Sequence, residues 1–208
     1  MGVIKALDGN AAIAHGVMRS KVQLVAAYPI TPQTPIVETI SSLIDKKEYD
    51  ATYITVESEH SALSAVIGAA STGVRTFTAS ASHGLALMHE VTGVASASRL
   101  PVVMAVVSRA IPGPMCLWCD HSDIMTQRDQ GWIQLFAESP QEGLDFTMIA
   151  YRTSEDERVL TPTMVDIDGF YCSHLTEPVD VPTEDEAERF ISEFRPVNAQ
   201  LNTDMPYA

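Results

Sequence analysis

The sequence alternates between short segments rich in apolar and β-branched residues and longer segments with helical periodicity. We expect strands at residues 22–27, 52–56, 75–79, 102–107, 132–137 and 163–167, and helices at residues 10–20, 34–47, 61–71, 84–98 and 141–152. Strands that alternate with helices form βαβ units, in which the strands run parallel. Several of these strands are apolar on both faces, which is typical of a sheet covered on both sides. The sequence therefore predicts an α/β fold with a mostly parallel sheet between two layers of helices.

The composition fits a chain with a sizeable core and limits its partners. Of the 208 residues, 46% are hydrophobic and 19% are charged, so there is enough apolar surface to bury. The formal net charge of -14 argues against nucleic acid or an anionic membrane as a partner, because both require a basic surface. No apolar run approaches the roughly 20 residues that span a bilayer, and no signal peptide is recognisable. We expect a cytoplasmic protein.

The composition changes near Thr183. Residues 1–182 carry the strand and helix pattern, and we expect them to form one α/β domain. Residues 183–208 begin with the acidic segment TEDEAERFISEF, which predicts a short helix, and continue as an extended tail or linker.

Three loops that follow predicted strands carry polar side chains. They read AYPITPQTP at residues 27–35, ESEHS at residues 57–61 and SRAIPGPMCLWCDHSD at residues 108–123. Ligands of parallel sheets bind at the carboxyl ends of the strands, so we expect the three loops to meet at one edge of the sheet.

The second loop places two acids, Glu57 and Glu59, at the start of an apolar helix with Ser58 between them. One explanation is structural, because Ser58 is a suitable N-cap and an acid in the first turn interacts favourably with the helix dipole. The other is that Glu59 faces a cleft and takes part in chemistry.

Arg109, at the end of a predicted strand, also has two interpretations. It either pairs at the surface with Asp120 or Asp123, or its planar guanidinium binds a substrate carboxylate. The sequence leaves both open. In the first loop, Pro29 and Pro32 restrict the backbone, so Thr31 presents its hydroxyl from a stiff segment.

The sequence shows no clear metal or phosphate motif. Cys116, Cys119 and His121 could ligate zinc, but a structural zinc site normally has four ligands and no second cluster is visible, so we expect no metal site and small apolar packing for the cysteines. The sequence contains neither GxGxxG nor GxxxxGK[ST], so we expect something other than a glycine-rich loop of this chain to hold the phosphates of any cofactor. Structural or surface roles are expected for His15, His83, His89 and His174.

Six segments in order resemble the α subunit of the 2-oxoacid:ferredoxin oxidoreductases, the thiamine diphosphate enzymes that include pyruvate:ferredoxin oxidoreductase. They are YPITP (28–32), ESEHSALSAVIGA (57–69), TFTASASHGLALM (76–88), SRA (108–110), CDHSDIMTQRDQGWIQ (119–134) and DGFYCSH (168–174). The resemblance covers residues 10–182 and implies the pyrimidine-binding module of the thiamine diphosphate fold. The segments RDQGWIQ (128–134) and EDERVL (155–160) are similar to those of the phenylglyoxylate and oxalate branches of the family. Oxalate-type members carry Arg at the position of Thr31, which argues against oxalate.

The resemblance also implies roles for individual residues. Glu59 matches the glutamate that hydrogen-bonds the aminopyrimidine ring and thereby promotes loss of the thiazolium C2 proton. Thr31 and Arg109 match the residues that bind the 2-oxoacid, with Arg109 on its carboxylate. Pro29 matches a residue beside the pyrimidine, and Tyr28 is expected to bind the cofactor with it.

The activity implied is oxidative decarboxylation of a 2-oxoacid, of pyruvate or phenylglyoxylate type, to an acyl-CoA. The diphosphate and its Mg²⁺ would be held by a β subunit, and iron–sulfur clusters by ferredoxin-like partner chains. Met115, Leu117 and Trp118 are expected to shape the pocket for the apolar end of the acid. The alternatives are half of another thiamine diphosphate enzyme, of decarboxylase or transketolase type, and a non-catalytic flavodoxin-like interaction module.

Overall fold

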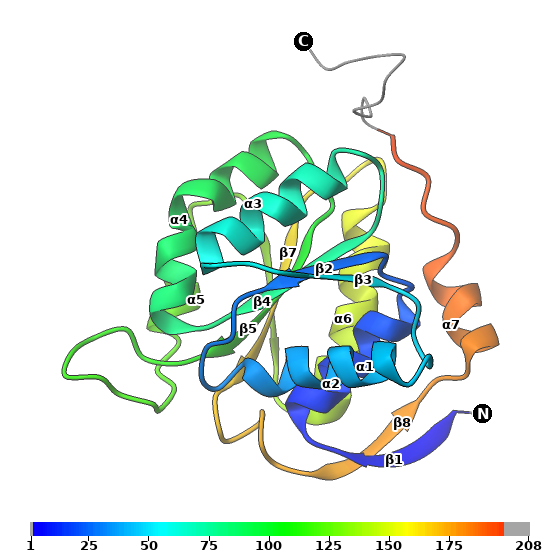
Figure 1. Cartoon of the computed structure of the whole chain (residues 1–208), viewed down its shortest axis with the longest axis horizontal. Coiled ribbons are helices and arrows are strands. Elements are labelled where there is room, and N and C mark those ends of the chain that lie inside the picture. The colour runs from blue at the N-terminus through cyan, green and yellow to red at the C-terminus, as the bar shows by residue number, and fades with distance from the viewer. Residues whose placement is uncertain (1, 198–208) are drawn as a thin grey trace.

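The computed structural model describes residues 2–197, and its centre is a six-stranded sheet in which every pairing is parallel (Figure 1). The strand order is β3-β2-β4-β5-β7-β6. These strands are β2 (Leu24–Ala27), β3 (Thr52–Thr55), β4 (Thr76–Ser80), β5 (Val103–Ser108), β6 (Ile133–Ala137) and β7 (Thr163–Asp168). Five of the strands begin and end within one residue of the predicted positions, and β2 begins two residues later than predicted. The predicted α/β fold is confirmed.

Helices cover both faces of this sheet (Figure 1). One layer holds α1 (Gly9–Arg19), α2 (Thr34–Asp45) and α6 (Pro140–Ser154), and the other holds α3 (Glu59–Ala70), α4 (Ser82–Ala97) and the short α5 (Ser122–Met125). None of the described helices is both long and apolar enough to cross a membrane.

Two apolar cores lie between the sheet and these layers. Strand β5 contributes to both, because successive side chains of a strand point to opposite faces. Val103 and Ala105 pack with α1 and α6, whereas Met104 and Val106 pack with α3 and α4. All four side chains are fully buried. Burial on both faces explains why β5 is apolar along its whole length.

A separate antiparallel pair was not expected from the sequence. It joins β1 (Val3–Leu7) to β8 (Glu177–Val181), with Val3 opposite Val181. Pro178 and the acids of β8 weaken its strand signal, since proline cannot donate to a ladder and acids are rare in strands. The pairing also links segments from the two ends of the described chain, which no local pattern reveals.

The predicted acidic helix is confirmed as α7 (Glu184–Ile191), which begins with a capping box between Thr183 and Glu186. Ala187 and Ile191 are buried in the core beside α1 and α6. Arg75, from the start of β4, forms two hydrogen bonds of 2.6 and 2.8 Å with Glu155 and one of 2.9 Å with the carbonyl of Ser192 after α7. The end of the expected tail, residues 198–208, lies outside the described residues.

Candidate active site

The loops after β2 and β5 meet at one edge of the sheet, as the sequence predicts, and the segment after β4, which was not predicted to take part, lies with them. Arg109, directly after β5, donates from Nη1 to the carbonyl oxygen of Thr31 at 2.7 Å. Its Nη2 lies 3.4 Å from Nδ1 of His83, in the first turn of α4. Residues far apart in the sequence are therefore neighbours at the carboxyl edge, where parallel sheets bind their ligands.

Arg109 is buried, with 6% of its surface exposed. Among the described residues its guanidinium contacts no carboxylate, and its Nε has no hydrogen-bond partner. The alternative of a surface ion pair with Asp120 or Asp123 is therefore wrong. A buried cation without a counter-charge is costly, so this guanidinium is suited to bind an anion such as a carboxylate.

Asp123 does not pair with the guanidinium of Arg109 but binds backbone N–H groups. Its carboxylate is fully buried and accepts hydrogen bonds from the backbone N–H groups of Ser82 (2.7 Å), Arg109 (2.9 Å) and Ile124 (2.9 Å). The hydroxyl of Ser108 donates to it at 2.9 Å. One side chain thus joins the start of α4, the end of β5 and the start of α5, and it holds Arg109 by its backbone.

The two neighbouring acids, Glu57 and Glu59, have separate environments. Ser58 is the N-cap of α3, and its hydroxyl accepts from the N–H of Ser61 at 3.2 Å, as expected. Glu57 is exposed and accepts from the hydroxyl of Ser61 at 2.6 Å, which lowers the pKa of its carboxyl. The local structural role at this helix start therefore belongs to Glu57 and Ser58.

Glu59, the first residue of α3, is 8% exposed. In the described part of the chain, no hydrogen bond or ion pair engages its carboxylate. A Cβ placed on Gly84 would lie 2.6 Å from Oε1 of Glu59, so only glycine leaves this carboxylate its space. The same Cβ would lie 2.7 Å from Oγ of Ser80, a buried hydroxyl without a partner. Glu59 is a sheltered acid that is free to bind a ligand.

The family of the chain follows from comparison with known proteins. The family model described as "Pyruvate flavodoxin/ferredoxin oxidoreductase, thiamine diP-bdg" matches residues 15–208. The chain belongs to this family. The predicted resemblance to the 2-oxoacid:ferredoxin oxidoreductases is thereby confirmed.

Relatives of the chain carry names from the same group. It is 49% identical over 203 residues to pyruvate synthase subunit PorA of Methanocaldococcus jannaschii, covering 98% of this chain and 52% of that protein. It is 45% identical over 204 residues to ketoisovalerate oxidoreductase subunit VorA of Pyrococcus furiosus, covering 98% and 51%. The chain therefore spans about half the length of these curated relatives.

A solved structure also matches this thiamine diphosphate-binding domain. It is the 2-oxoglutarate:ferredoxin oxidoreductase from Magnetococcus marinus with 2-oxoglutarate, coenzyme A and succinyl-CoA bound. The TM-score is 0.78 at 25% sequence identity, over 88% of this chain and 32% of that chain.

His83, for which the sequence predicted a structural or surface role, lies beside Arg109 at the candidate site of this oxidoreductase-family domain. Its side chain is exposed, and its Nδ1 lies 3.1 Å from the hydroxyl of Ser82 as well as 3.4 Å from Arg109. Both contacts involve Nδ1, and no described contact engages Nε2. The signal in the sequence was its position directly after a strand, in a segment that carries the family resemblance.

The other histidines contact groups away from Arg109. His15 is buried, and its pKa is lowered to about 4 by burial and by the nearby charges of Lys5 and Arg19. His89 bonds Gln127 at 2.9 Å, and His174 stacks on Phe170.

The remaining predicted residues of the family's active site lie exposed. Tyr28 and Pro29 follow β2 directly, so both rings are accessible to a ligand, and their role stays a prediction. Met115 and Trp118, on the loop after β5, have exposed fractions of 73% and 70%. The N–H of Ala110 closes the base of this loop by donating to the carbonyl oxygen of Trp118 at 2.9 Å. Their contribution to a substrate pocket also stays a prediction.

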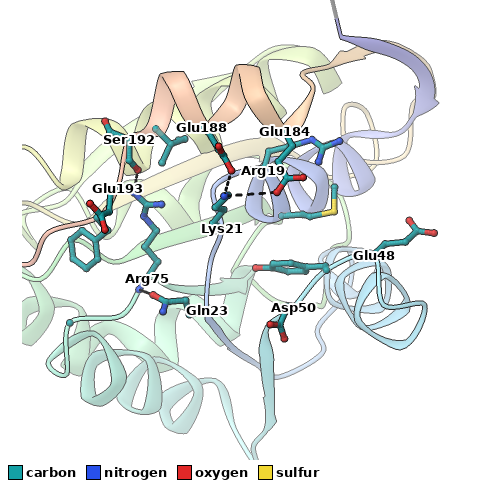
Figure 2. Close-up of a pocket in the computed structure, with 15 residues that line it drawn as sticks. Arg19, Lys21, Gln23, Glu48, Asp50, Arg75, Glu184, Glu188, Ser192 and Glu193 are labelled. Atoms are coloured by element: carbon teal, nitrogen blue, oxygen red, sulfur yellow. Dashed lines mark hydrogen bonds and ion pairs between the residues drawn. The ribbon is translucent and has the colours of Figure 1, made fainter.

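A large hollow of about 840 Å³ lies at the opposite edge of the sheet (Figure 2). Its lining includes Lys21, which pairs with Glu184 and Glu188 of α7, and Arg75, whose guanidinium is already bound to Glu155. This edge holds the amino ends of the strands, and two of its cations, Lys21 and Arg75, are paired with acids. Glu59 and Arg109, whose charged groups have no counter-charge among the described residues, lie together at the other edge, which is the candidate active site.

The cysteines differ from their expected packing. Cys172 is buried in the core as a small apolar residue, but Cys116 and Cys119 are only half-buried. Cys119 and His121 lie close to Asp168, and Cys116 is not part of this group.

Proposed function

We propose that this chain forms the pyrimidine-binding side of the active site in a thiamine diphosphate-dependent 2-oxoacid:ferredoxin oxidoreductase. The enzyme would oxidatively decarboxylate a 2-oxoacid to an acyl-CoA and pass the electrons to iron–sulfur clusters on partner chains. The observation that carries this proposal is the sheltered, unpartnered carboxylate of Glu59, on the same edge of the sheet as the buried cation Arg109.

The residues around Glu59 fit a cofactor of this kind. An aminopyrimidine offers N–H groups and a ring nitrogen, and a carboxylate held in a poorly hydrated place binds such groups strongly. Gly84 keeps the space beside Oε1 open. When bound, thiamine diphosphate supplies the carbon nucleophile that adds to the 2-oxo group. Glu59 would hold the proton shared with the pyrimidine nitrogen.

Arg109 and its neighbours would bind the 2-oxoacid. The guanidinium supplies the positive charge for one carboxylate, while Thr31 adds a neutral hydroxyl and His83 an N–H donor. No second free cation accompanies Arg109 in the contacts described here. We infer a substrate with one carboxylate, of pyruvate or phenylglyoxylate type, and the names of the relatives favour pyruvate-like acids.

The remaining parts of the enzyme would come from other chains. A β subunit would hold the diphosphate and its Mg²⁺, because this sequence contains neither of the common glycine-rich phosphate motifs. Ferredoxin-like subunits would carry the clusters, since three cysteines cannot build a four-thiolate cluster. The complex would act in the cytoplasm, where coenzyme A and ferredoxin are available.

Replacing Glu59 by Gln in the assembled complex tests the proposal. The amide keeps the shape of the side chain but cannot exchange a proton with the pyrimidine nitrogen. We expect the exchange rate of the thiamine C2 proton, followed by NMR, to fall by ~10²–10⁴-fold. Glu57→Gln is the matched control, because this acid lies two residues away and serves the helix start. Wild-type exchange in the Glu59→Gln complex would reduce Glu59 to a structural residue.

The substrate class is tested by assaying the complex with pyruvate, phenylglyoxylate, 2-oxoglutarate and oxalate, together with coenzyme A and a viologen dye. We expect dye reduction with the two monocarboxylates and little with the two dicarboxylates. A preference for a dicarboxylate would contradict the single-cation site. Release of an aldehyde without dye reduction would indicate a decarboxylase instead.

A further inference from the structure

We propose that Cys119, His121 and Asp168 bind one divalent transition-metal ion of the zinc type. Their ligand atoms, a sulfur, a ring nitrogen and a carboxylate oxygen, all lie within 4.8 Å of one another. Bonds of about 2.0–2.3 Å in a tetrahedral site separate the ligand atoms by about 3.5 Å. Small side-chain rotations, closing each gap by roughly 1 Å, are therefore enough to hold the ion.

The carboxylate of Asp166 lies behind His121, as carboxylates commonly do behind histidines that bind metal ions. Nδ1 of His121 lies 2.9 Å from Oδ2 of Asp166, which is 1% exposed. The hydroxyl of Ser108 lies 2.6 Å from the other oxygen of Asp166 and 2.9 Å from the carboxylate of Asp123, so its one proton is shared between the two acids. A histidine whose one ring nitrogen lies against a buried carboxylate can present its other nitrogen, Nε2, as a metal ligand.

The sulfur of Cys119 lies within 4.8 Å of a carboxylate oxygen of Asp168. Two negative charges at this distance repel each other unless a cation lies between them. A thiolate and the Asp168 carboxylate together balance the two charges of a divalent cation.

The combination of ligands selects the kind of ion. Thiolate and imidazole favour zinc or cobalt(II), whereas Mg²⁺ and Ca²⁺ require oxygen ligands. Three protein ligands leave a fourth position open to water, consistent with the half-buried state of all three side chains. The ion would fasten the loop that carries Cys119 to the end of β7.

Cys116 supplies a matched control. It lies three residues before Cys119 in the same loop and is also half-buried, but it is outside the ligand group. Co²⁺ titration of the purified 208-residue chain, with millimolar Mg²⁺ present, should produce a sulfur-to-cobalt charge-transfer band with one equivalent bound. The Cys116→Ser chain should produce the same band.

Cys119→Ser should abolish the band and weaken Co²⁺ binding by at least ~10-fold, and Asp166→Asn should weaken it by ~10–100-fold while the band remains. Far-UV circular dichroism of each variant checks that it is folded. In the assembled complex, elemental mass spectrometry should show one zinc fewer per chain in Cys119→Ser. Absence of a band in the wild-type chain, an unchanged band in Cys119→Ser, or loss of the band in Cys116→Ser would overturn the site.

Discussion

The buried side chain of Arg109 is held in place by the protein but has no counter-charge among the described residues. Its backbone N–H and part of its guanidinium are held by the protein, through Asp123 and the carbonyl of Thr31. These contacts fix its position without neutralising its charge. An anionic substrate can therefore supply the missing counter-charge and find the guanidinium already in place.

Arg109→Lys should raise the KM for the 2-oxoacid and lower kcat/KM by roughly 10–100-fold. An ammonium group cannot reproduce a two-pronged contact with a carboxylate, and hydrogen bonds to charged groups contribute roughly 1.5–3 kcal/mol. Steady-state kinetics of the assembled complex measure this effect, and cofactor affinity should remain unchanged. Arg128→Lys is a suitable control, because Arg128 is exposed and pairs with Asp129. If Arg109→Lys and Arg128→Lys had the same KM and kcat/KM, Arg109 would not bind the substrate.

At the scale of elements, the candidate site rests on hydrogen bonds that connect the end of β5 with the starts of α4 and α5. Strand β5 ends at Ser108, α4 begins at Ser82, and α5 begins at Ser122. The carboxylate of Asp123 accepts hydrogen bonds from all three regions, and the hydroxyl of Ser82 donates to the carbonyl of Ala110 at 2.9 Å. These contacts place His83 beside Arg109.

Asp123→Asn should destabilise the protein strongly. The amide has one acceptor oxygen where the carboxylate has two, and its NH₂ would face backbone N–H donors inside the protein. We expect the free energy of unfolding to fall by about 2–4 kcal/mol, which lowers the Tm by roughly 5–15 °C in a domain of this size. Differential scanning calorimetry measures the change.

Asp120→Asn provides the comparison for that variant. Asp120 is exposed and accepts from the N–H of Ser122 at 2.8 Å. We expect a change within about 0.5–1 kcal/mol, as for other exposed hydrogen bonds. A similar loss of stability in both variants would contradict the central role of Asp123.

At the scale of the whole molecule, the two edges of the sheet have different roles. The carboxyl edge carries Glu59 and Arg109, whereas at the amino edge Arg75 joins β4 to Glu155 and to the carbonyl of Ser192. The chain covers about half the length of its curated relatives. Under the proposed function, this chain supplies only one side of the active site.

This chain alone should bind thiamine diphosphate weakly. Its contacts would reach the pyrimidine, while the diphosphate, which carries the charge of the cofactor, would be held elsewhere. Isothermal titration calorimetry with Mg²⁺ present should give a Kd well above 1 μM, that is, a binding free energy weaker than about -8 kcal/mol. Adding the partner subunit should restore tight binding. Sub-micromolar binding by the isolated chain would show that the phosphate site is in this chain.

The layers of the fold and the edge that carries the candidate site could both be predicted from the sequence alone. Both follow from local patterns, since hydrophobic periodicity separates strands from helices and parallel strands bring their carboxyl ends together. The N-cap at Ser58 and the helix α7 were also predictable, because capping depends on neighbouring residues. Glu59, Thr31 and Arg109 were singled out by a resemblance in motifs, and the structure places Thr31 beside Arg109.

The contacts that separate the competing interpretations are visible only in the folded chain. The local contacts at the start of α3 belong to Glu57, and the carboxylate of Glu59 has no partner among the described residues. The guanidinium of Arg109 is buried without a contact to a carboxylate, and Asp168 rather than Cys116 lies close to Cys119. The physical reason is that burial and partner choice depend on packing between segments tens of residues apart. No local period or propensity encodes those contacts.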